Sequence, residues 1–154
     1  MKRVLLSLLF AGIAVPAFAI GPLQTSGERQ VAQLVSDGTV GAAVALDTWA
    51  AWHAKDRTRA LVCEGVKDAT VGAVGLLGQH YITSPRPDGT GNGMPSLHSM
   101  FAGATIASSD HWWANALLTA ATEAGRYFGG RHTFKQVLVG GVLGAGLSFI
   151  RCGQ

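Results

Sequence analysis

Two arginines, two histidines and a serine between residues 86 and 132 are of the types that phosphoryl transfer needs. A phosphoryl group in transfer carries negative charge on its oxygens, so it is stabilised by fixed positive charge and hydrogen-bond donors. Arginine provides both, because its planar side chain donates two parallel hydrogen bonds and stays charged at any working pH. A neutral histidine can attack phosphorus, and a protonated one can give its proton to the leaving oxygen. The five residues are Arg86, Ser96, His98, Arg126 and His132.

The sequence around these residues indicates how they would be held. Arg86 stands between two prolines in residues 82–94, a segment rich in Pro, Gly, Asp and Asn that reads as a loop. A long polar loop between apolar helices is often functional. Ser96 follows Pro95, a residue that favours the first turn of a helix. The N–H groups of that turn would add donors at the helix end that favours an anion.

Apolar residues recur at helical spacing along most of the chain, and no alternating strand pattern interrupts them. We therefore expect an all-α, single-domain bundle of about six helices. Asp37 and Gly38 are expected to separate the first two helices, with Ser26 as the N-cap of the first. The predicted helices cover residues 26–35, 40–53, 58–80, 95–108, 110–126 and 134–150.

Residues 1–19 have the pattern of a secretory signal peptide. Lys2 and Arg3 precede the apolar residues 4–15, and Ala17-Phe18-Ala19 matches a cleavage site. We expect cleavage and export to the periplasm or beyond, with residues 20–154 as the mature domain; an uncleaved anchor is the alternative. Cleavage would remove two of the 12 basic residues and none of the nine acidic ones, so the net charge would fall from +3 to +1. The chain therefore gives no indication of nucleic-acid binding.

Two cysteines, Cys63 and Cys152, are present. An exported chain meets an oxidising compartment, so a disulfide between them is one interpretation and two free thiols are the other. The longest apolar run after the signal peptide, residues 137–150, is shorter than the roughly 20 residues of a membrane-spanning helix. A soluble protein, or one that contacts a membrane surface, is therefore favoured.

The motif residues resemble the type 2 phosphatidic acid phosphatase superfamily, which includes class A acid phosphatases, lipid phosphate phosphatases and vanadium haloperoxidases. That family has Arg-Pro in its first motif, Pro-Ser-Gly-His in its second, and Ser-Arg followed by His and Asp in its third. Arg86-Pro87, Pro95-Ser96 with His98, and Arg126 with His132 stand in the same order here. The resemblance implies that His132 is the nucleophile, His98 the general acid, and Arg86, Ser96 and Arg126 the phosphate ligands.

Four positions depart from the family pattern. Gln79 stands where the family has lysine, Leu97 where it has glycine, Gly125 where it has serine, and Gln136 where it has aspartate. The resemblance places Gln79 and Leu97 among the phosphate-binding positions and Gln136 beside the nucleophile. A glutamine can fix the tautomer of a histidine but cannot stabilise its positive charge as a carboxylate does, and the comparable change in a serine protease costs about ten-thousandfold in rate.

Two functions follow from the sequence. The first is an exported phosphatase that hydrolyses a phosphomonoester or a diphosphate, lipid-linked or not, through a phosphohistidine. The second is a pseudo-phosphatase that binds phosphate-bearing ligands without turnover. No cofactor is expected, vanadate should mimic phosphate, and Gln136→Asp should raise the rate. The spacing of the histidines does not support a metal site, and the Gly-x-Ser-x-Gly motif of a serine hydrolase is not present around Ser96.

Overall fold

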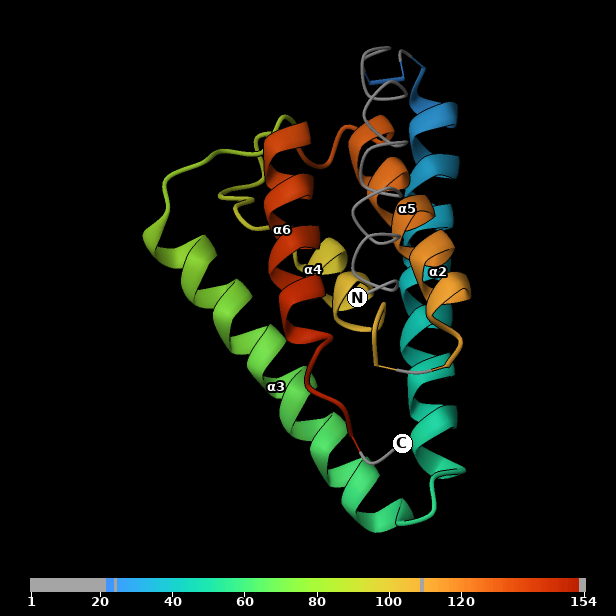
Figure 1. Cartoon of the computed structure of the whole chain (residues 1–154). Helices are drawn as coiled ribbons and strands as arrows, with labels where there is room; N and C mark the ends of the chain where they lie inside the picture. Colours follow the sequence, from blue (N-terminus) through green and yellow to red (C-terminus); the bar gives the residue numbers. More distant parts are fainter. Residues whose placement is uncertain (1–21, 24, 109, 153–154) are drawn as a thin grey trace.

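The computed structural model describes residues 22–23, 25–108 and 110–152, and in this part of the chain it contains five α-helices and no strands. The expectation of an all-α fold is confirmed. The signal peptide expected over residues 1–19 lies outside the described residues. The helices are α2 (Ser26–Trp52), α3 (Arg57–Tyr81), α4 (Leu97–Ala104), α5 (Trp112–Phe128) and α6 (Phe134–Leu147), arranged as Figure 1 shows.

The predicted break at Asp37 and Gly38 is wrong, because α2 runs through both residues without interruption. Its N-cap is Thr25, not Ser26: Thr25 and Glu28 form a capping box in which each side chain bonds the backbone of the other. A glycine inside a helix costs about 1 kcal/mol relative to alanine. Close packing of α2 on α5 is the compensating interaction, and it includes a contact of 2.9 Å between the hydroxyls of Thr39 and Thr122.

The other helix boundaries shift by a few residues from those predicted. Helix α4 begins at Leu97 with Ser96 as its N-cap, so Pro95 lies before the helix and not in its first turn. It also ends at Ala104, four residues earlier than predicted. Helix α5 has His111, and not Asp110, at its N-cap. Helix α6 ends at Leu147, three residues before the predicted end, and Ser148 is its C-cap.

Helix α4 lies in the middle of the bundle and contacts all four other described helices. Its contact with α6 is made by glycines. A Cβ atom added to Gly103 would lie 2.7 Å from the carbonyl oxygen of Gly141, and one added to Gly140 would lie 2.5 Å from that of Ser96. Because real Cβ atoms do not approach a backbone so closely, these glycines are what allows the two helices to pack at this distance.

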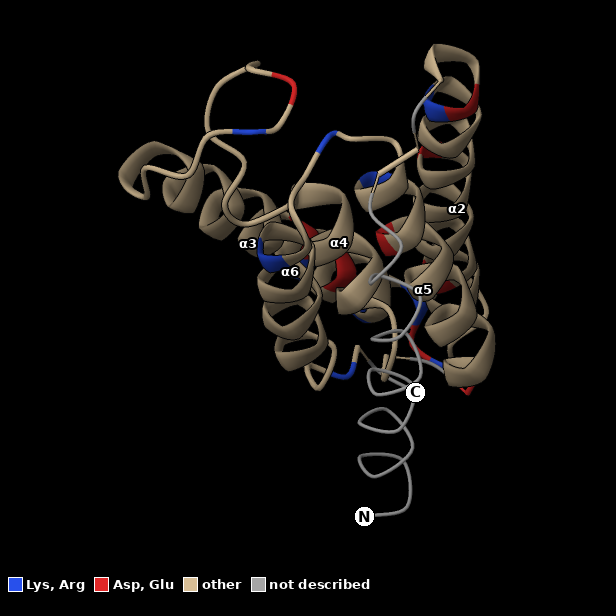
Figure 2. Cartoon of the chain, turned by 90° about the horizontal axis from the view of Figure 1, so that it is seen from above, with Lys and Arg blue, Asp and Glu red and all other residues tan. Residues whose placement is uncertain are grey.

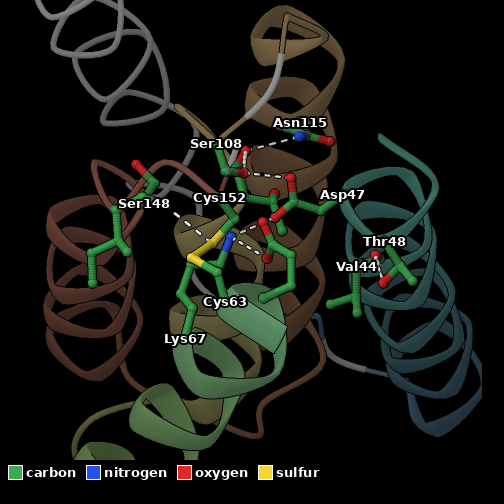
Figure 3. Close-up of polar contacts among 12 residues, drawn as sticks. Val44, Asp47, Thr48, Cys63, Lys67, Ser108, Asn115, Ser148 and Cys152 are labelled. Atoms are coloured by element: carbon green, nitrogen blue, oxygen red, sulfur yellow. Dashed lines mark hydrogen bonds and ion pairs between the residues drawn. A yellow bond between two sulfur atoms is a disulfide. The ribbon is translucent and has the colours of Figure 1, made fainter. Parts of the chain in front are cut away.

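Much of the interior is polar. Lys67 of α3 is buried between Asp47 of α2 and Glu64 of α3, with its Nζ atom 2.6 Å from an oxygen of each (Figure 3). The hydroxyl of Ser108 donates to the other oxygen of Asp47 at 2.5 Å. We call these four residues the ionic network. The apolar core beside it is small and centres on Val71, Met100 and Ala104.

Large apolar side chains are instead exposed on the outer surface. On α3, Val62 and Val66 are each 63% exposed, and Tyr81 at its end is 77% exposed. None of the helices in the described part of the chain combines the length and the apolar character needed to cross a membrane.

The pairing of the two cysteines, which the sequence left open, is made in the structure. Cys63 on α3 and Cys152 after α6 form a disulfide across 89 residues of sequence. The bridge lies beside the ionic network, as Figure 3 shows. It therefore ties the end of the described chain to the first half of α3.

Candidate active site

Two loops bring the motif residues to one end of the bundle. Residues 82–96 connect α3 to α4, and residues 129–133 connect α5 to α6, and both loops lie at the same end in Figure 1. Seen from above in Figure 2, both loops carry basic positions, and the first also carries an acidic one. Arg86 comes from the first loop, His98 from α4, Arg126 from the end of α5, and His132 from the second loop. We call these four residues the basic cluster.

Backbone hydrogen bonds fold the first loop back on itself and fix Arg86. The N–H of Arg86 donates to Gly91 at 2.8 Å, and that of Gly93 donates to Ser84 at 2.9 Å. Gly89 and Gly91 have positive φ angles of 75° and 96°, a conformation that favours glycine. The Nε atom of Arg86 is buried and has no hydrogen-bond partner in the described part of the chain.

Two glutamines, Gln136 and Gln79, hold this loop in place. The side-chain amide of Gln136 donates to the carbonyl and the hydroxyl of Ser84, each at 2.9 Å, and to the carbonyl of Pro85 at 3.1 Å. Its oxygen accepts the N–H of Thr133 at 3.0 Å. Gln79 donates to the carbonyl of Pro95 at 3.0 Å. Both side chains therefore use their amide donors on the loop backbone.

His132 is 2% exposed, and its Nδ1 atom lies 3.2 Å from the carbonyl oxygen of Gly93. A carbonyl oxygen only accepts hydrogen bonds, so Nδ1 must carry the proton, and the lone pair of the neutral ring is on Nε2. Burial, followed by the charges of Arg126 and Arg86, lowers the pKa of His132 to about 4. Hydrogen bonding with Gln136 and Gly93 offsets only part of that shift. His132 is thus a neutral imidazole beside two arginines.

Arg126 connects the two histidines. It is 6% exposed, and its backbone carbonyl accepts the N–H of His132 at 3.2 Å. Its Nη1 atom donates to an oxygen of Asp37 at 3.3 Å, and the same oxygen lies 3.0 Å from Nε2 of His98. The Nε atom of Arg126 is buried and, like that of Arg86, has no partner among the described residues. Burial lowers the pKa of Arg126, and Asp37 acts in the opposite direction.

His98 is partly buried, and this burial together with the charge of Arg126 lowers its pKa. Asp37 opposes this shift through its charge and its hydrogen bond. No motif in the sequence pointed to this role for Asp37, which stands sixty-one residues before His98 in a segment expected to be a helix break. The contact depends on the packing of α2 against α5, which no local pattern reveals.

Ser96 and Leu97 occupy the start of α4. Ser96 is fully buried, its hydroxyl accepts a hydrogen bond from Ser99 at 3.1 Å, and it makes no side-chain cap. The side chain of Leu97 packs against α3 at Gly75. The side chain of Leu97 therefore contributes to helix packing, and the phosphate-binding role implied by the family resemblance would fall to its backbone N–H.

Two other carboxylates that could have paired with His132 have different surroundings. Asp88 forms a salt bridge of 3.1 Å with Arg131, which links the two loops, and also accepts bonds from Thr90. Glu123 lies between α5 and α6 against Gly141, where burial raises its pKa to about 8. The hydrogen-bonding contributions to the pKa of His132 come from Gln136 and Gly93 and not from either carboxylate.

The structure thus brings Arg86, His98, Arg126 and His132 to one place and gives Gln79, Gln136 and Leu97 contacts with the chain itself. No protein-family model matches this chain, and no curated protein or solved structure matches it at a significant level.

Proposed function

We propose that this protein is a phosphatase in which Nε2 of His132 attacks phosphorus and forms a phosphohistidine. The observation that carries the proposal is the hydrogen bond from Nδ1 of His132 to the Gly93 carbonyl, beside two arginines whose buried Nε atoms lack partners among the residues that the structure describes. The bond leaves Nε2 with a lone pair, and buried donors without partners suit an anion. The order of the motif residues, which resembles that of the type 2 phosphatidic acid phosphatases, supports the same reaction.

The reaction has two steps. In the first, the lone pair of His132 Nε2 forms the N–P bond, the bond from phosphorus to the leaving oxygen breaks, and His98 gives that oxygen a proton. In the second, a water molecule attacks phosphorus, the N–P bond breaks, and His98 takes a proton from the water. Arg86 and Arg126 bind the equatorial oxygens throughout, where negative charge is concentrated.

The substrate class follows from the charge and the surroundings of the cluster. Two arginines suit a phosphomonoester or the terminal group of a diphosphate. Exposed apolar residues at the end of α3, Leu77, Tyr81 and Ile82, lead directly into the loop of Arg86, which favours a lipid-linked substrate and contact with a membrane surface. The disulfide fits an exported protein in an oxidising compartment.

A second function, binding of phosphate-bearing ligands without turnover, is favoured by the surroundings of His132. The Gly93 carbonyl and the Gln136 side chain can fix its tautomer, but neither carries the negative charge that would stabilise the ring once it becomes positive. Slow turnover is therefore expected even if the first function is correct.

The test is hydrolysis of an aryl phosphate and of a lipid phosphate in vesicles by the wild-type protein and by His132→Ala. His53→Ala, which changes an exposed histidine at the far end of α2, is the matched control. We expect His132→Ala to lower kcat/KM by about a thousandfold or more and His53→Ala to leave it unchanged. Acid-labile phosphate on the wild-type protein alone would identify the phosphohistidine. Equal background rates in wild type and His132→Ala, with vanadate still bound, would instead establish the binding function.

A further inference from the structure

One oxygen of Asp37 contacts two members of the basic cluster at once. It lies 3.0 Å from Nε2 of His98 and 3.3 Å from Nη1 of Arg126. The side chain of Asp37 is 57% exposed, that of His98 is 36% exposed, and that of Arg126 is 7% exposed. The carboxylate therefore approaches from the solvent side and balances the buried charge of Arg126.

The packing of α2 fixes the position of this carboxylate. Ser36, the residue before Asp37, is fully buried against Gly125 of α5, where an added Cβ would lie 2.8 Å from the Cβ of Ser36. One turn away, Gln33 donates to the carbonyl of Gly129 at 3.0 Å. Asp37 thus projects from a helix that is held in the turn just before it, and a glycine at position 125 is required for that close approach.

The charged groups that act on His98 come from three elements. They are Asp37 on α2, Arg126 on α5 and Arg131 in the loop between α5 and α6. Burial and the two arginines favour loss of the ring proton, and Asp37 favours its retention. A general acid must hold a proton until the leaving oxygen needs it. Without Asp37, a histidine between two arginines would lose its proton too readily.

We propose, building on the phosphatase function above, that Asp37 is a positioning residue that binds His98 through Nε2, raises the proton affinity of its ring beside Arg126, and directs Nδ1 to the leaving oxygen. In the first step the Nδ1–H bond breaks, its electron pair stays on Nδ1, and the proton goes to the leaving oxygen. Nε2 keeps its own proton, and Asp37 stays ionised. In the second step the neutral Nδ1 recovers a proton from the attacking water.

The first test measures proton binding by His98 directly and needs no activity. The ring of His98 is titrated by NMR in the wild type and in Asp37→Asn, with the signal assigned by its loss in His98→Asn. Asparagine keeps the shape of the side chain and removes only its charge. We expect the pKa of His98 to fall by about one unit or more in Asp37→Asn, which is a tenfold loss of proton affinity.

Asp88→Asn is the matched control, because Asp88 also pairs with an arginine at this end of the molecule but through Arg131 and not His98. A clearly smaller shift is expected there, and Asp37→Glu, which keeps the charge, should retain most of the wild-type value. An unchanged or higher pKa in Asp37→Asn would overturn the proposal. So would equal shifts in Asp37→Asn and Asp88→Asn, because the effect would then be general charge.

The second test uses the leaving group. An alkyl phosphate needs a proton on its leaving oxygen, whereas dinitrophenyl phosphate does not. We expect Asp37→Asn to lower kcat for the alkyl ester about tenfold and for the dinitrophenyl ester less than about twofold. Equal losses on both would mean a structural role only. Faster turnover of both, with tighter vanadate binding, would mean that Asp37 competes with the substrate, and either result overturns the proposal.

The two tests separate this proposal from the function on which it rests. If the wild type and His132→Ala hydrolyse both esters at the same background rate, the phosphatase function fails. The NMR titration still decides in that case whether Asp37 holds the proton of His98.

Discussion

His132 has the two properties that a histidine nucleophile requires, and different neighbours supply them. The carbonyl of Gly93 fixes the proton on Nδ1, and burial beside Arg126 and Arg86 keeps the ring neutral. Gly93 must itself be a glycine, because a Cβ there would lie 2.7 Å from Arg86 Cγ and 2.8 Å from Gln136 Oε1. The backbone at Gly93 thus takes over the tautomer-fixing part of the role that the family resemblance gives to residue 136.

The low pKa of His132 predicts a pH profile. The lone pair on Nε2 is available only while the ring is neutral. Protonation of His132 should therefore not lower kcat/KM until the pH falls to about 4. Below that pH kcat/KM should fall tenfold per unit. The measurement is kcat/KM for an aryl phosphate between pH 3 and 8. An acid limb near pH 6.5, the ordinary value for histidine, would contradict the surroundings described for His132.

The same shift predicts a loss of stability in acid. The pKa of His132 is about 4 in the folded protein, whereas the ordinary value for histidine is 6.5, so between these values the unfolded chain binds more protons. The free energy of unfolding should therefore fall as the pH falls from 6.5 to 4, by up to about 3 kcal/mol from this residue. Urea unfolding of wild type and His132→Asn across this range measures it. An equally steep pH dependence in both proteins would rule out His132 as the source.

The contacts of Gln136 change the expectation for Gln136→Asp. The resemblance seen in the sequence predicted a faster rate, because aspartate is the residue that the resemblance implies at position 136. In the structure, the Gln136 amide donates to Ser84 and Pro85, and a shorter carboxylate would lose those bonds and face their oxygens. Unpaired buried groups cost about 1–3 kcal/mol each, and here that cost would fall on the loop that carries Arg86. We therefore expect kcat/KM to fall about tenfold or more. Gln136→Glu, with the same length and no donor, is the control, and a faster Gln136→Asp enzyme would restore the original prediction.

Much of the candidate site could be predicted from the sequence, because its members lie in short motifs. Arg86, His98, Arg126 and His132 were identified by type and order, and the structure brings them together. The role of Asp37 could not be predicted from the sequence, because its contacts form only when α2 packs on α5. The same holds for the loop contacts of Gln79 and Gln136, since a pattern of residue types does not show which donors a loop backbone will need.

Among the helices, α2 shows where local reasoning fails. Asp37 and Gly38 resemble a helix end, yet the surrounding residues pack against α5 along the whole segment and the helix continues. The long helix α3 and the loop at residues 82–94 were predicted well, because apolar periodicity and the density of Pro and Gly are strong local signals. Helix boundaries at α4 and α6 were extended too far, because apolar residues continue past both ends.

The glycine contact between α4 and α6 gives a prediction with a control on the same helix. A Cβ at Gly144 would lie 2.9 Å from the N of Ala104 and would also meet the carbonyl of Met100, whereas a Cβ at Gly146 would have no atom of the described residues within 4 Å. Gly144→Ala should therefore destabilise the protein by about 2 kcal/mol or more. Gly146→Ala should stabilise it by about 0.5–1 kcal/mol through helix propensity. Chemical unfolding measures both, and equal effects would contradict the close packing.

At the scale of the whole molecule, the described interior holds a buried ionic network beside a small apolar core. Burial lowers the pKa of Lys67, but Asp47 and Glu64 more than offset this, so the net shift is upward and the ammonium stays charged. Burial also raises the pKa of Glu64. The network joins α2 and α3 within the halves of these helices nearer the turn that connects them, and this turn lies at the end of the bundle away from the two loops in Figure 1.

Removal of the cation should therefore be costly. Lys67→Met keeps the volume but leaves two buried carboxyl groups without it, and we expect a loss of about 3–5 kcal/mol in the free energy of unfolding. Lys135→Met, at an exposed position on α6, should change it by less than about 0.5 kcal/mol. Chemical unfolding of the two variants at pH 7 provides the comparison. A loss below 1 kcal/mol for Lys67→Met would mean that the network contributes little.

The disulfide between Cys63 and Cys152 closes a covalent ring that contains every member of the basic cluster. A single proteolytic cut in the loop of Arg86 would therefore yield two fragments that stay joined until a reductant is added. Nicked protein should keep its mass on a non-reducing gel, and the four side chains would remain on one covalent molecule.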